Sequence, residues 1–176
     1  LKSGKVGFFQ LRLKNYSFKK KILIGKKIRK ICKDNNVKFL INDDPLLTKM
    51  INADGCHLGQ NDMHIENAKK IIKNKIIGIT CHNSIRLAKK AVKSGASYIA
   101  FGAFFASKTK KTKFKAEINI LKQFKNFSKT PVVAIGGINY ENYKKLLLNK
   151  VNFLAISGYI WNNKKIRPQQ AIKMFK

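Results

Sequence analysis

The segment PVVAIGGI (131–138) decides the fold class, because a short apolar strand ends there in two consecutive glycines. The next strand candidate, NFLAIS (152–157), also ends beside a glycine, Gly158. Early strand candidates end instead in polar segments without glycine, QLRLK (10–14) and INDD (41–44). An open doubly wound sheet normally carries a glycine-rich phosphate loop after an early strand, whereas (β/α)8 barrels commonly bind phosphate after their last two strands. The late glycines therefore favour a barrel.

Outward from that segment, short β-branched or aromatic runs alternate with longer amphipathic stretches. Helical patterns are expected at 17–33 from Ser17, at 83–94 from Asn83, at 139–149 from Asn139, and at about 168–175 with Pro168 in the first turn. The remaining strand candidates are VGFFQL (6–11), VKFLIN (37–42), GCHL (55–58), KIIGI (75–79) and YIAFG (98–102). Strands that are each followed by a helix predict an α/β fold, here a (β/α)8 TIM barrel.

A closed barrel of this kind needs one strand more than the sequence offers. The segment LKSGK (1–5) resembles the tail of a helix that stops at Gly4 before the next strand. We therefore expect the first strand and most of the first helix to lie upstream of Leu1. Residues 1–176 would then form a single, N-terminally incomplete barrel domain.

The composition combines 38 basic with only 8 acidic residues, a formal net charge of +30. Lysine dominates and is spread over nearly every helix; the only arginines are Arg12, Arg29, Arg86 and Arg167. Readers of nucleic-acid sequence use arginine for base edges, so lysine-rich solvated helix faces are the favoured interpretation and a nucleic-acid surface is the alternative. Either way, the charge favours the arrival of phosphorylated substrates.

Three cysteines without CxxC spacing, Cys32, Cys56 and Cys81, argue against a disulfide framework or a zinc site. No apolar run is long enough to span a membrane, and no export signal is recognisable. The expected location is the cytoplasm, with small phosphorylated substrates and no membrane or specific nucleic-acid partner. A homo-oligomer is left open.

Cations and carboxylates follow the early strands, where barrel enzymes place their chemistry. Arg12 and Lys14 are two residues apart at a strand end and point the same way, which suits a diphosphate. Solvated surface charges are the alternative. Asp43 and Asp62 follow consecutive strands, and two carboxylates beside cations are the usual means of holding Mg²⁺ on a diphosphate. The alternative for each is N-capping, of helices at 44–51 and 64–72.

Glycines and histidines mark the other strand ends. Gly136-Gly137 and Ser157-Gly158 suit a phosphate site built from backbone N–H groups. His57, on an apolar strand, is expected to belong to the core, whereas the role of His82 is open.

Several ordered motifs make the chain similar to the thiamine-phosphate synthase family along its whole length. They are QLRLK (10–14), IND (41–43), ADGCHLGQND (53–62), GITCH (78–82), GAFFASKTK (102–110), PVVAIGGI (131–138) and IS (156–157). Thr80 and Ser107 differ conservatively from the family pattern, and Ala103 and Ala106 stand where prolines are usual.

The resemblance implies a condensation of hydroxymethylpyrimidine diphosphate with a thiazole phosphate, releasing pyrophosphate, with Mg²⁺ as cofactor. The catalytic residues it implies are Arg12, Lys14, Thr80 and Lys110, and the metal ligands are Asp43 and Asp62. The pyrimidine diphosphate would be held by Gln10, Leu11, Arg12, Leu13, Lys14, Asn42, Thr80 and Lys110. The thiazole phosphate would be held by Ser107, Lys108, Thr109, Gly137, Ile156 and Ser157. A thiazole tautomerase of the same superfamily is the alternative enzyme, and a basic nucleic-acid-binding protein is the alternative class.

Overall fold

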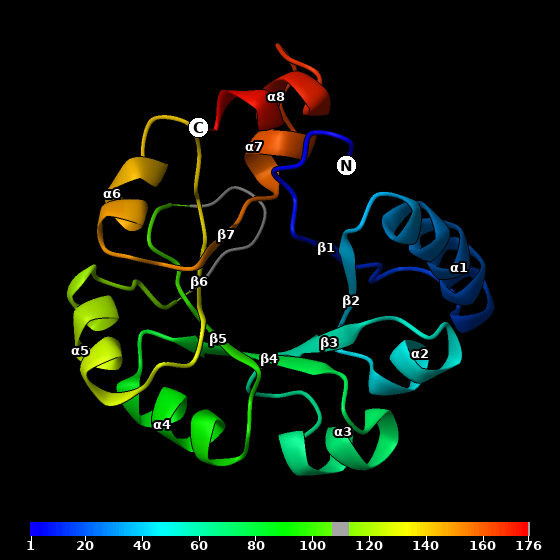
Figure 1. Ribbon diagram of the computed structural model, residues 1–176, viewed down its shortest axis with the longest axis horizontal. Helices are drawn as coiled ribbons and strands as arrows, with labels where there is room; N and C mark the ends of the chain where they lie inside the picture. Colours follow the sequence, from blue (N-terminus) through cyan, green and yellow to red (C-terminus); the bar gives the residue numbers. More distant parts are fainter. Residues whose placement is uncertain (107–112, 176) are drawn as a thin grey trace. The chain divides into compact units, whose positions relative to one another are not determined.

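The computed structural model describes residues 1–106 and 113–175 and divides the chain into two compact units. Unit 1 comprises Leu1–Ile79 and unit 2 comprises Thr80–Lys176. Figure 1 follows the elements of both units in sequence colours.

Unit 1 alternates parallel strands with helices. Its strands β1, β2, β3 and the first part of β4 pair in that order, and all of these pairs are parallel. Helices α1, α2 and α3 lie together on one side of these strands (Figure 1). The elements are β1 (Phe8–Leu11), α1 (Phe18–Asp34), β2 (Lys38–Asn42), α2 (Pro45–Met50), β3 (Gly55–Leu58), α3 (Ile65–Ile72) and β4 (Ile76–His82), which runs past the division between the units.

Unit 2 continues the alternation. Strand β5 pairs with β6 and β6 with β7, again in parallel. Helix α4 contacts α5, and the two short last helices, α7 and α8, contact each other. The elements are α4 (Ile85–Lys93), β5 (Tyr98–Phe101), α5 (Asn119–Phe127), β6 (Val132–Ile135), α6 (Tyr143–Leu148), β7 (Phe153–Ala155), α7 (Gly158–Trp161) and α8 (Pro168–Met174).

Each unit buries its own apolar cluster. In unit 1, Phe39 and Ile41 of β2 are fully or almost fully buried against residues of β1, α1 and α2. In unit 2, Phe101 of β5 packs edge-on against Phe124 of α5, with ring centroids 5.4 Å apart. Each large apolar side chain that is fully buried stabilises the folded state by about 1.5–3 kcal/mol. The packing fixes the strands, and so it fixes where the strand ends present their polar residues.

The predicted alternation of parallel strands and helices is confirmed, and every strand candidate overlaps an observed strand. Ser17 is the N-cap of α1, accepting from the Lys20 N–H, and Pro168 opens α8. Two predicted helix starts are wrong. Ser84, not Asn83, caps α4, and α6 begins only after Asn142, because Asn139 accepts from the N–H groups of Glu141 and Asn142 in a turn.

Two further details differ from expectation. Strand β4 extends to His82, so Thr80 and His82 lie within a strand and not beyond one. Residues 2–3 form a turn and not a helix tail, although Gly4 has a φ of +70°, as expected of a stop.

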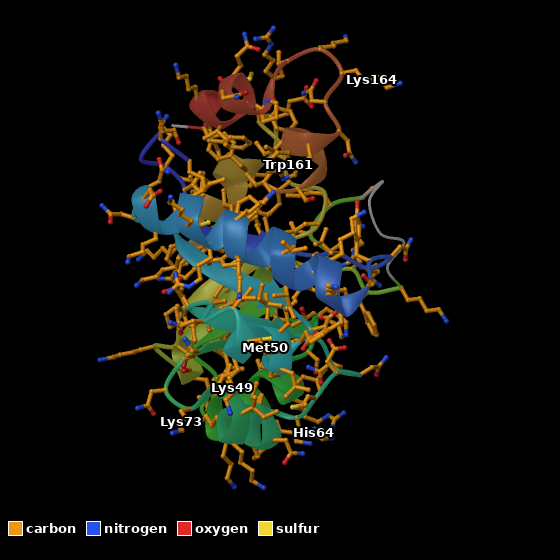
Figure 2. All side chains as sticks on the ribbon, turned by 90° about the vertical axis from the view of Figure 1, so that its right-hand side faces the viewer. Lys49, Met50, His64, Lys73, Trp161 and Lys164 are labelled. Carbon is orange, nitrogen blue, oxygen red and sulfur yellow. The ribbon has the colours of Figure 1, made fainter. Side chains whose placement is uncertain are left out.

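Lysine side chains cover the outer faces of the helices. Figure 2 labels Lys49 on α2, next to the exposed Met50, and Lys73, the C-cap residue of α3. Among the described residues, no helix combines the length and the apolar character needed to cross a membrane.

Candidate functional site

The polar residues at the ends of β1 and β2 lie side by side in unit 1. Leu11 pairs with Ile41 in the parallel register. Gln10 precedes Leu11 on β1 and Asn42 follows Ile41 on β2, so the two residues lie close together on adjacent strands. The Gln10 side-chain amide donates to Asn42 Oδ1 at 2.7 Å. Two motifs that are far apart in sequence are thereby joined at one edge of the sheet.

Asp43 and Asp62 share a hydrogen bond between their carboxyl groups. Asp43 has a φ of +65°, a conformation that aspartate tolerates better than most residues, and its backbone N–H donates to the carbonyl of His57 at 2.8 Å. Asp62 Oδ2 accepts from the Gly59 N–H at 2.7 Å, which fixes the second carboxylate. The structure therefore brings together the two residues predicted to be metal ligands.

Helix capping does not explain either carboxylate. The N-cap of α2 is Asp44, whose Oδ1 accepts from the Leu47 N–H at 2.9 Å. The N-cap of α3 is His64, which makes no side-chain capping bond. The capping alternative for Asp43 and Asp62 is therefore wrong, because neighbouring residues occupy both cap positions.

Electrostatics place Arg12 and Lys14 near the carboxylate pair. Partial burial raises the pKa of Asp43 to about 6, and both the hydrogen bond and the charge of Asp62 add to that shift. The charges of Arg12 and Lys14 lower the same pKa. Two carboxylates that share a proton while cations stand nearby are typical of a site that a divalent cation stabilises.

The donor set suits a hard cation that keeps several other ligands. The described residues contain no group of three or more His, Cys, Asp or Glu able to hold a metal. Burial raises the pKa of Cys56 and of Cys81 to about 12, so neither thiol is an available thiolate ligand. Mg²⁺ is commonly bound through one or two carboxylates, with water and substrate phosphate completing its shell. Asp43 and Asp62 fit that pattern.

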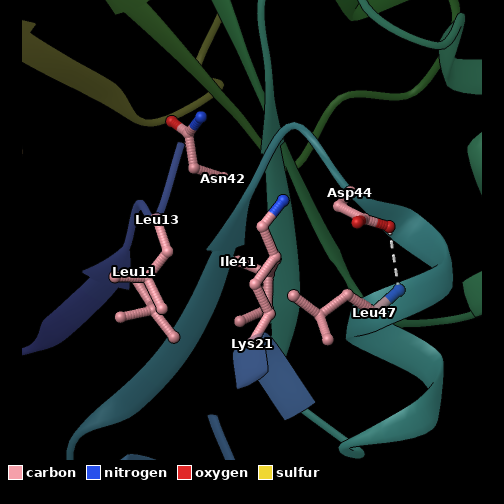
Figure 3. Close-up of a pocket in the computed structure, with 7 residues that line it drawn as sticks. All are labelled: Leu11, Leu13, Lys21, Ile41, Asn42, Asp44 and Leu47. Atoms are coloured by element: carbon pink, nitrogen blue, oxygen red, sulfur yellow. Dashed lines mark hydrogen bonds between the residues drawn. The ribbon is translucent and has the colours of Figure 1, made fainter. Parts of the chain in front are cut away.

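A small cavity with both polar and apolar lining lies under this edge of unit 1, between α1 and α2 (Figure 3). It measures about 20 Å³, which is room for little more than one water molecule. Figure 3 shows Lys21 extending from α1 along this cavity, with Asn42 and Asp44 above it. The cavity is too small for a substrate and belongs to the packing beneath the polar strand ends. Its lining residues are Leu11, Leu13, Lys21, Ile41, Asn42, Asp44 and Leu47.

In unit 2 the candidate site is a backbone turn formed by two glycines after β6. Gly136 and Gly137 follow β6 with φ values of +95° and +65°, the left-handed region that favours glycine. The Phe104 and Phe105 N–H groups donate to the carbonyls of Ile135 and Gly136, each at 3.1 Å. A Cβ on Gly137 would stand 2.3 Å from the Ala106 carbonyl oxygen. These two glycines are therefore required by the turn itself.

The other residues predicted for the phosphate lie after β7. Ile156 is half-buried, and Ser157 is exposed at the N-cap position of α7, where its side chain makes no capping bond. Ser107, Lys108, Thr109 and Lys110 lie outside the described residues. Thr80 is half-buried in the part of β4 that belongs to unit 2.

The two histidines differ in their surroundings. His57 is buried on β3, which agrees with the predicted core position. His82 has a φ of +53°, and its ring stacks on Phe114 with centroids 4.0 Å apart. The His82 carbonyl also accepts from the Gly102 N–H at 2.9 Å. His82 therefore helps to hold the segment after β5.

Sequence reasoning missed Asn142, whose side chain contacts the glycine turn. Its Nδ2 donates to the Gly137 carbonyl at 3.0 Å, and its Oδ1 accepts from the Asn139 N–H at 2.9 Å. The sequence signal was the presence of two asparagines, three residues apart, after GGI, because asparagine side chains often hydrogen-bond nearby backbone in turns.

The family model and the sequence relatives point to one family. Residues 1–160 match the thiamine monophosphate synthase family (TMP-TENI). The chain is 64% identical over 176 residues to the thiamine-phosphate synthase of Pelagibacter ubique, covering all of this chain and 85% of that protein. It is 46% identical over 140 residues to the Fusobacterium nucleatum thiamine-phosphate synthase, covering 79% of this chain and 68% of the other.

Solved structures give the same result for the fold. The thiamine phosphate pyrophosphorylase of Pyrococcus furiosus superposes with a TM-score of 0.87 at 30% identity, covering 96% of this chain and 80% of that one. A 3-hexulose-6-phosphate synthase superposes with a TM-score of 0.70 at 13% identity, a likeness of fold alone. The fold is α/β and TIM-barrel-like.

Proposed function

This chain belongs to the thiamine-phosphate synthase family and is a transferase of thiamine biosynthesis, and we propose the following reaction and the residues that perform it. The proposed reaction joins 4-amino-2-methyl-5-hydroxymethylpyrimidine diphosphate to a (carboxy)thiazole phosphate. The products are thiamine phosphate and pyrophosphate, with CO₂ as a third product when the thiazole substrate carries the carboxylate.

One observation carries the assignment of the diphosphate side: the Asp43–Asp62 carboxylate pair under the influence of Arg12 and Lys14. A diphosphate needs its negative charge neutralised, and cations beside two carboxylates suit a substrate that brings a divalent metal with it. We assign Asp43 and Asp62 as Mg²⁺ ligands. Bound there, Mg²⁺ would neutralise charge on the leaving diphosphate.

The remaining diphosphate contacts follow from the same edge of unit 1. Arg12 offers a planar fork to the phosphate oxygens, and Lys14 adds a second positive charge. Gln10 and Asn42, already hydrogen-bonded to each other, would orient the pyrimidine end of the substrate together with the backbone of Leu11 and Leu13. Thr80 and Lys110 complete the proposed set through a hydroxyl and an ammonium group.

The chemistry requires no protein nucleophile. The bond between the pyrimidine CH₂ and the diphosphate oxygen breaks, and its electron pair leaves with pyrophosphate. The electron-rich aminopyrimidine stabilises the resulting cation, and the thiazole nitrogen donates its lone pair to form the new C–N bond. Arg12 and Lys14 stabilise the charge that develops on the leaving group, and the bound geometry aligns the nitrogen.

We assign the thiazole phosphate to unit 2. Backbone N–H groups of a glycine turn bind a phosphate closely, which the turn at Gly136-Gly137 supports. Ile156 and the Ser157 hydroxyl would contribute from the end of β7, and Ser107, Lys108 and Thr109 from the segment after β5.

A coupled assay for pyrophosphate release from the two substrates, with and without Mg²⁺, tests this function. We expect release only when both substrates and the metal are present. Release that does not need the thiazole phosphate would contradict the condensation. A tautomerase would release no pyrophosphate, and it would not need the residues Arg12, Lys14, Asp43 and Asp62.

A nucleic-acid function is separable by salt. Non-specific binding driven by the net charge of +30 should be lost by about 0.3 M salt, whereas synthase activity should persist. The proposal further includes a cytoplasmic location, no specific nucleic-acid partner, a possible homo-oligomer, and closure of the strands with an eighth one into a single (β/α)8-barrel domain.

A further inference from the structure

The turn after β6 is held through three successive carbonyl groups. The carbonyls of Ile135 and Gly136 accept from the backbone N–H groups of Phe104 and Phe105, both at 3.1 Å. The third carbonyl, that of Gly137, accepts from the Asn142 side chain at 3.0 Å. Only the third peptide of the turn therefore depends on the chemistry of a side chain.

The Asn142 amide has one possible orientation in this arrangement. Its Oδ1 faces the N–H of Asn139 at 2.9 Å, a group that only donates. Its Nδ2 faces the Gly137 carbonyl, a group that only accepts. Asn139 in turn accepts from the Asn142 N–H at 3.0 Å, so the two asparagines brace each other.

Helix capping does not account for this side chain. Asn142 occupies the N-cap position of α6, yet it makes no side-chain capping bond to that helix. Its polar atoms are directed instead to the turn and to Asn139. Asn142 therefore orients the glycine turn after β6 and does not cap α6.

Because a peptide bond is planar and trans, fixing the Gly137 carbonyl also fixes the opposite direction of the Ile138 N–H. No backbone carbonyl within residues 1–106 and 113–175 pairs with the N–H of Gly137 or of Ile138. Two oriented N–H groups on consecutive residues form a typical anion-binding arrangement.

We propose that Asn142 is a positioning residue, which holds the Gly137–Ile138 peptide so that its N–H and that of Gly137 converge on the phosphate of the thiazole substrate. This inference rests on the proposed function of unit 2 and adds a residue to it. Asn142 acts through the backbone and does not touch the substrate.

The variants Asn142→Asp and Asn142→Ala test this role. Aspartate keeps the shape and the acceptor for the Asn139 N–H but has no donor for the Gly137 carbonyl. We expect both variants to raise the KM for the thiazole phosphate about tenfold and the KM for the pyrimidine diphosphate less than about twofold. The matched control is Asn149→Ala, which removes a 2.8 Å bond to the Lys145 carbonyl at the other end of α6 and should change neither KM.

Three results would overturn the inference: an unchanged thiazole KM in both variants, an equal rise for both substrates, or a rise in Asn142→Asp alone, which its new negative charge would explain. If the variants do not fold, amide NMR of the unaltered protein decides. Titration with inorganic phosphate should shift the Gly137 and Ile138 resonances most, and unchanged resonances refute the role. If these resonances shift but the unaltered protein releases no pyrophosphate, the proposed function fails while the anion-binding turn stands.

Discussion

The two units offer different groups to an anion: side chains in unit 1 and backbone in unit 2. Unit 1 gathers charged side chains, Arg12, Lys14, Asp43 and Asp62, on a sheet edge whose strands need none of them for packing. Unit 2 offers a backbone turn whose glycines have no space for a Cβ. In unit 1 the residues proposed to bind substrate are not the ones that stabilise the fold, whereas in unit 2 the same glycine turn serves both purposes. Substitutions should therefore affect activity in the first case and folding in the second.

The largest effect is expected for Asp62→Ala, with Asp44→Ala as its matched control. Asp62→Ala should reduce Mg²⁺-dependent pyrophosphate release by at least about a thousandfold, or about 4 kcal/mol, because a metal ligand is lost. Its loss of stability should be small, since the two bonds that disappear, from the Gly59 N–H and with the Asp43 carboxyl, both lie outside the apolar core. Asp44→Ala removes the α2 cap, so it should cost about 0.5–2 kcal/mol of stability and leave turnover intact. Full activity in a folded Asp62→Ala protein refutes the metal assignment.

In unit 2, Gly137→Ala should act mainly on folding. Gly4→Ala is the matched control, because Gly4 also has a positive φ but a Cβ there would meet nothing within 4 Å. We expect Gly4→Ala to lower the free energy of unfolding by about 1–2 kcal/mol. Gly137→Ala should lose about 1–3 kcal/mol more, because its Cβ would stand 2.3 Å from the Ala106 carbonyl. Denaturant unfolding measures both, and equal losses would show that the turn adapts.

Arg12→Lys probes whether unit 1 depends on geometry or on charge alone. The charge is kept, but lysine cannot reproduce a two-pronged contact with phosphate oxygens. We expect the chemical step to slow by roughly ten- to a hundredfold, about 1.4–2.7 kcal/mol, with a smaller effect on binding. Arg86→Lys on α4 is the control and should behave as the parent. Single-turnover kinetics within twofold of the parent would make Arg12 an ordinary surface cation.

The smallest expected effect is on the pH dependence of Mg²⁺ binding. The pKa of Asp43 is raised to about 6, so the folded protein keeps a proton on the pair at pH values where an isolated aspartate has lost it. A protonated carboxyl is a poor ligand, so Mg²⁺ affinity should fall as the pH drops below about 6, by up to roughly tenfold per pH unit. In Asp62→Asn the Mg²⁺ affinity should be weaker at every pH, because a proposed ligand is replaced, and its fall should begin at lower pH, because the Asp62 charge that raises the pKa of Asp43 is gone. Calorimetric titrations at several pH values measure this, and a flat profile contradicts it.

Much of this organisation could be predicted from the sequence. Apolar runs at regular spacing locate the strands, because burial dictates them, and the parallel order brings consecutive strand ends together. That logic predicted the meeting of Asp43 with Asp62. It could not distinguish Asp43 from Asp44 as the cap, because both precede the same helical pattern and only the backbone conformation separates them. For the same reason Asn139 was taken for the start of α6, while Asn142 went unnoticed.

The cations and carboxylates of unit 1 occupy one early stretch of the chain, from Gln10 to Asp62, and the glycine turn comes much later. A ribosome adds about 5–20 residues per second, so the growing chain needs roughly 4 to 15 s to pass from Asp62 to Gly137. During those seconds it carries the complete set of side chains assigned to Mg²⁺ and none of the turn assigned to the thiazole phosphate. The order of synthesis thus separates in time two sites that the finished enzyme must use together.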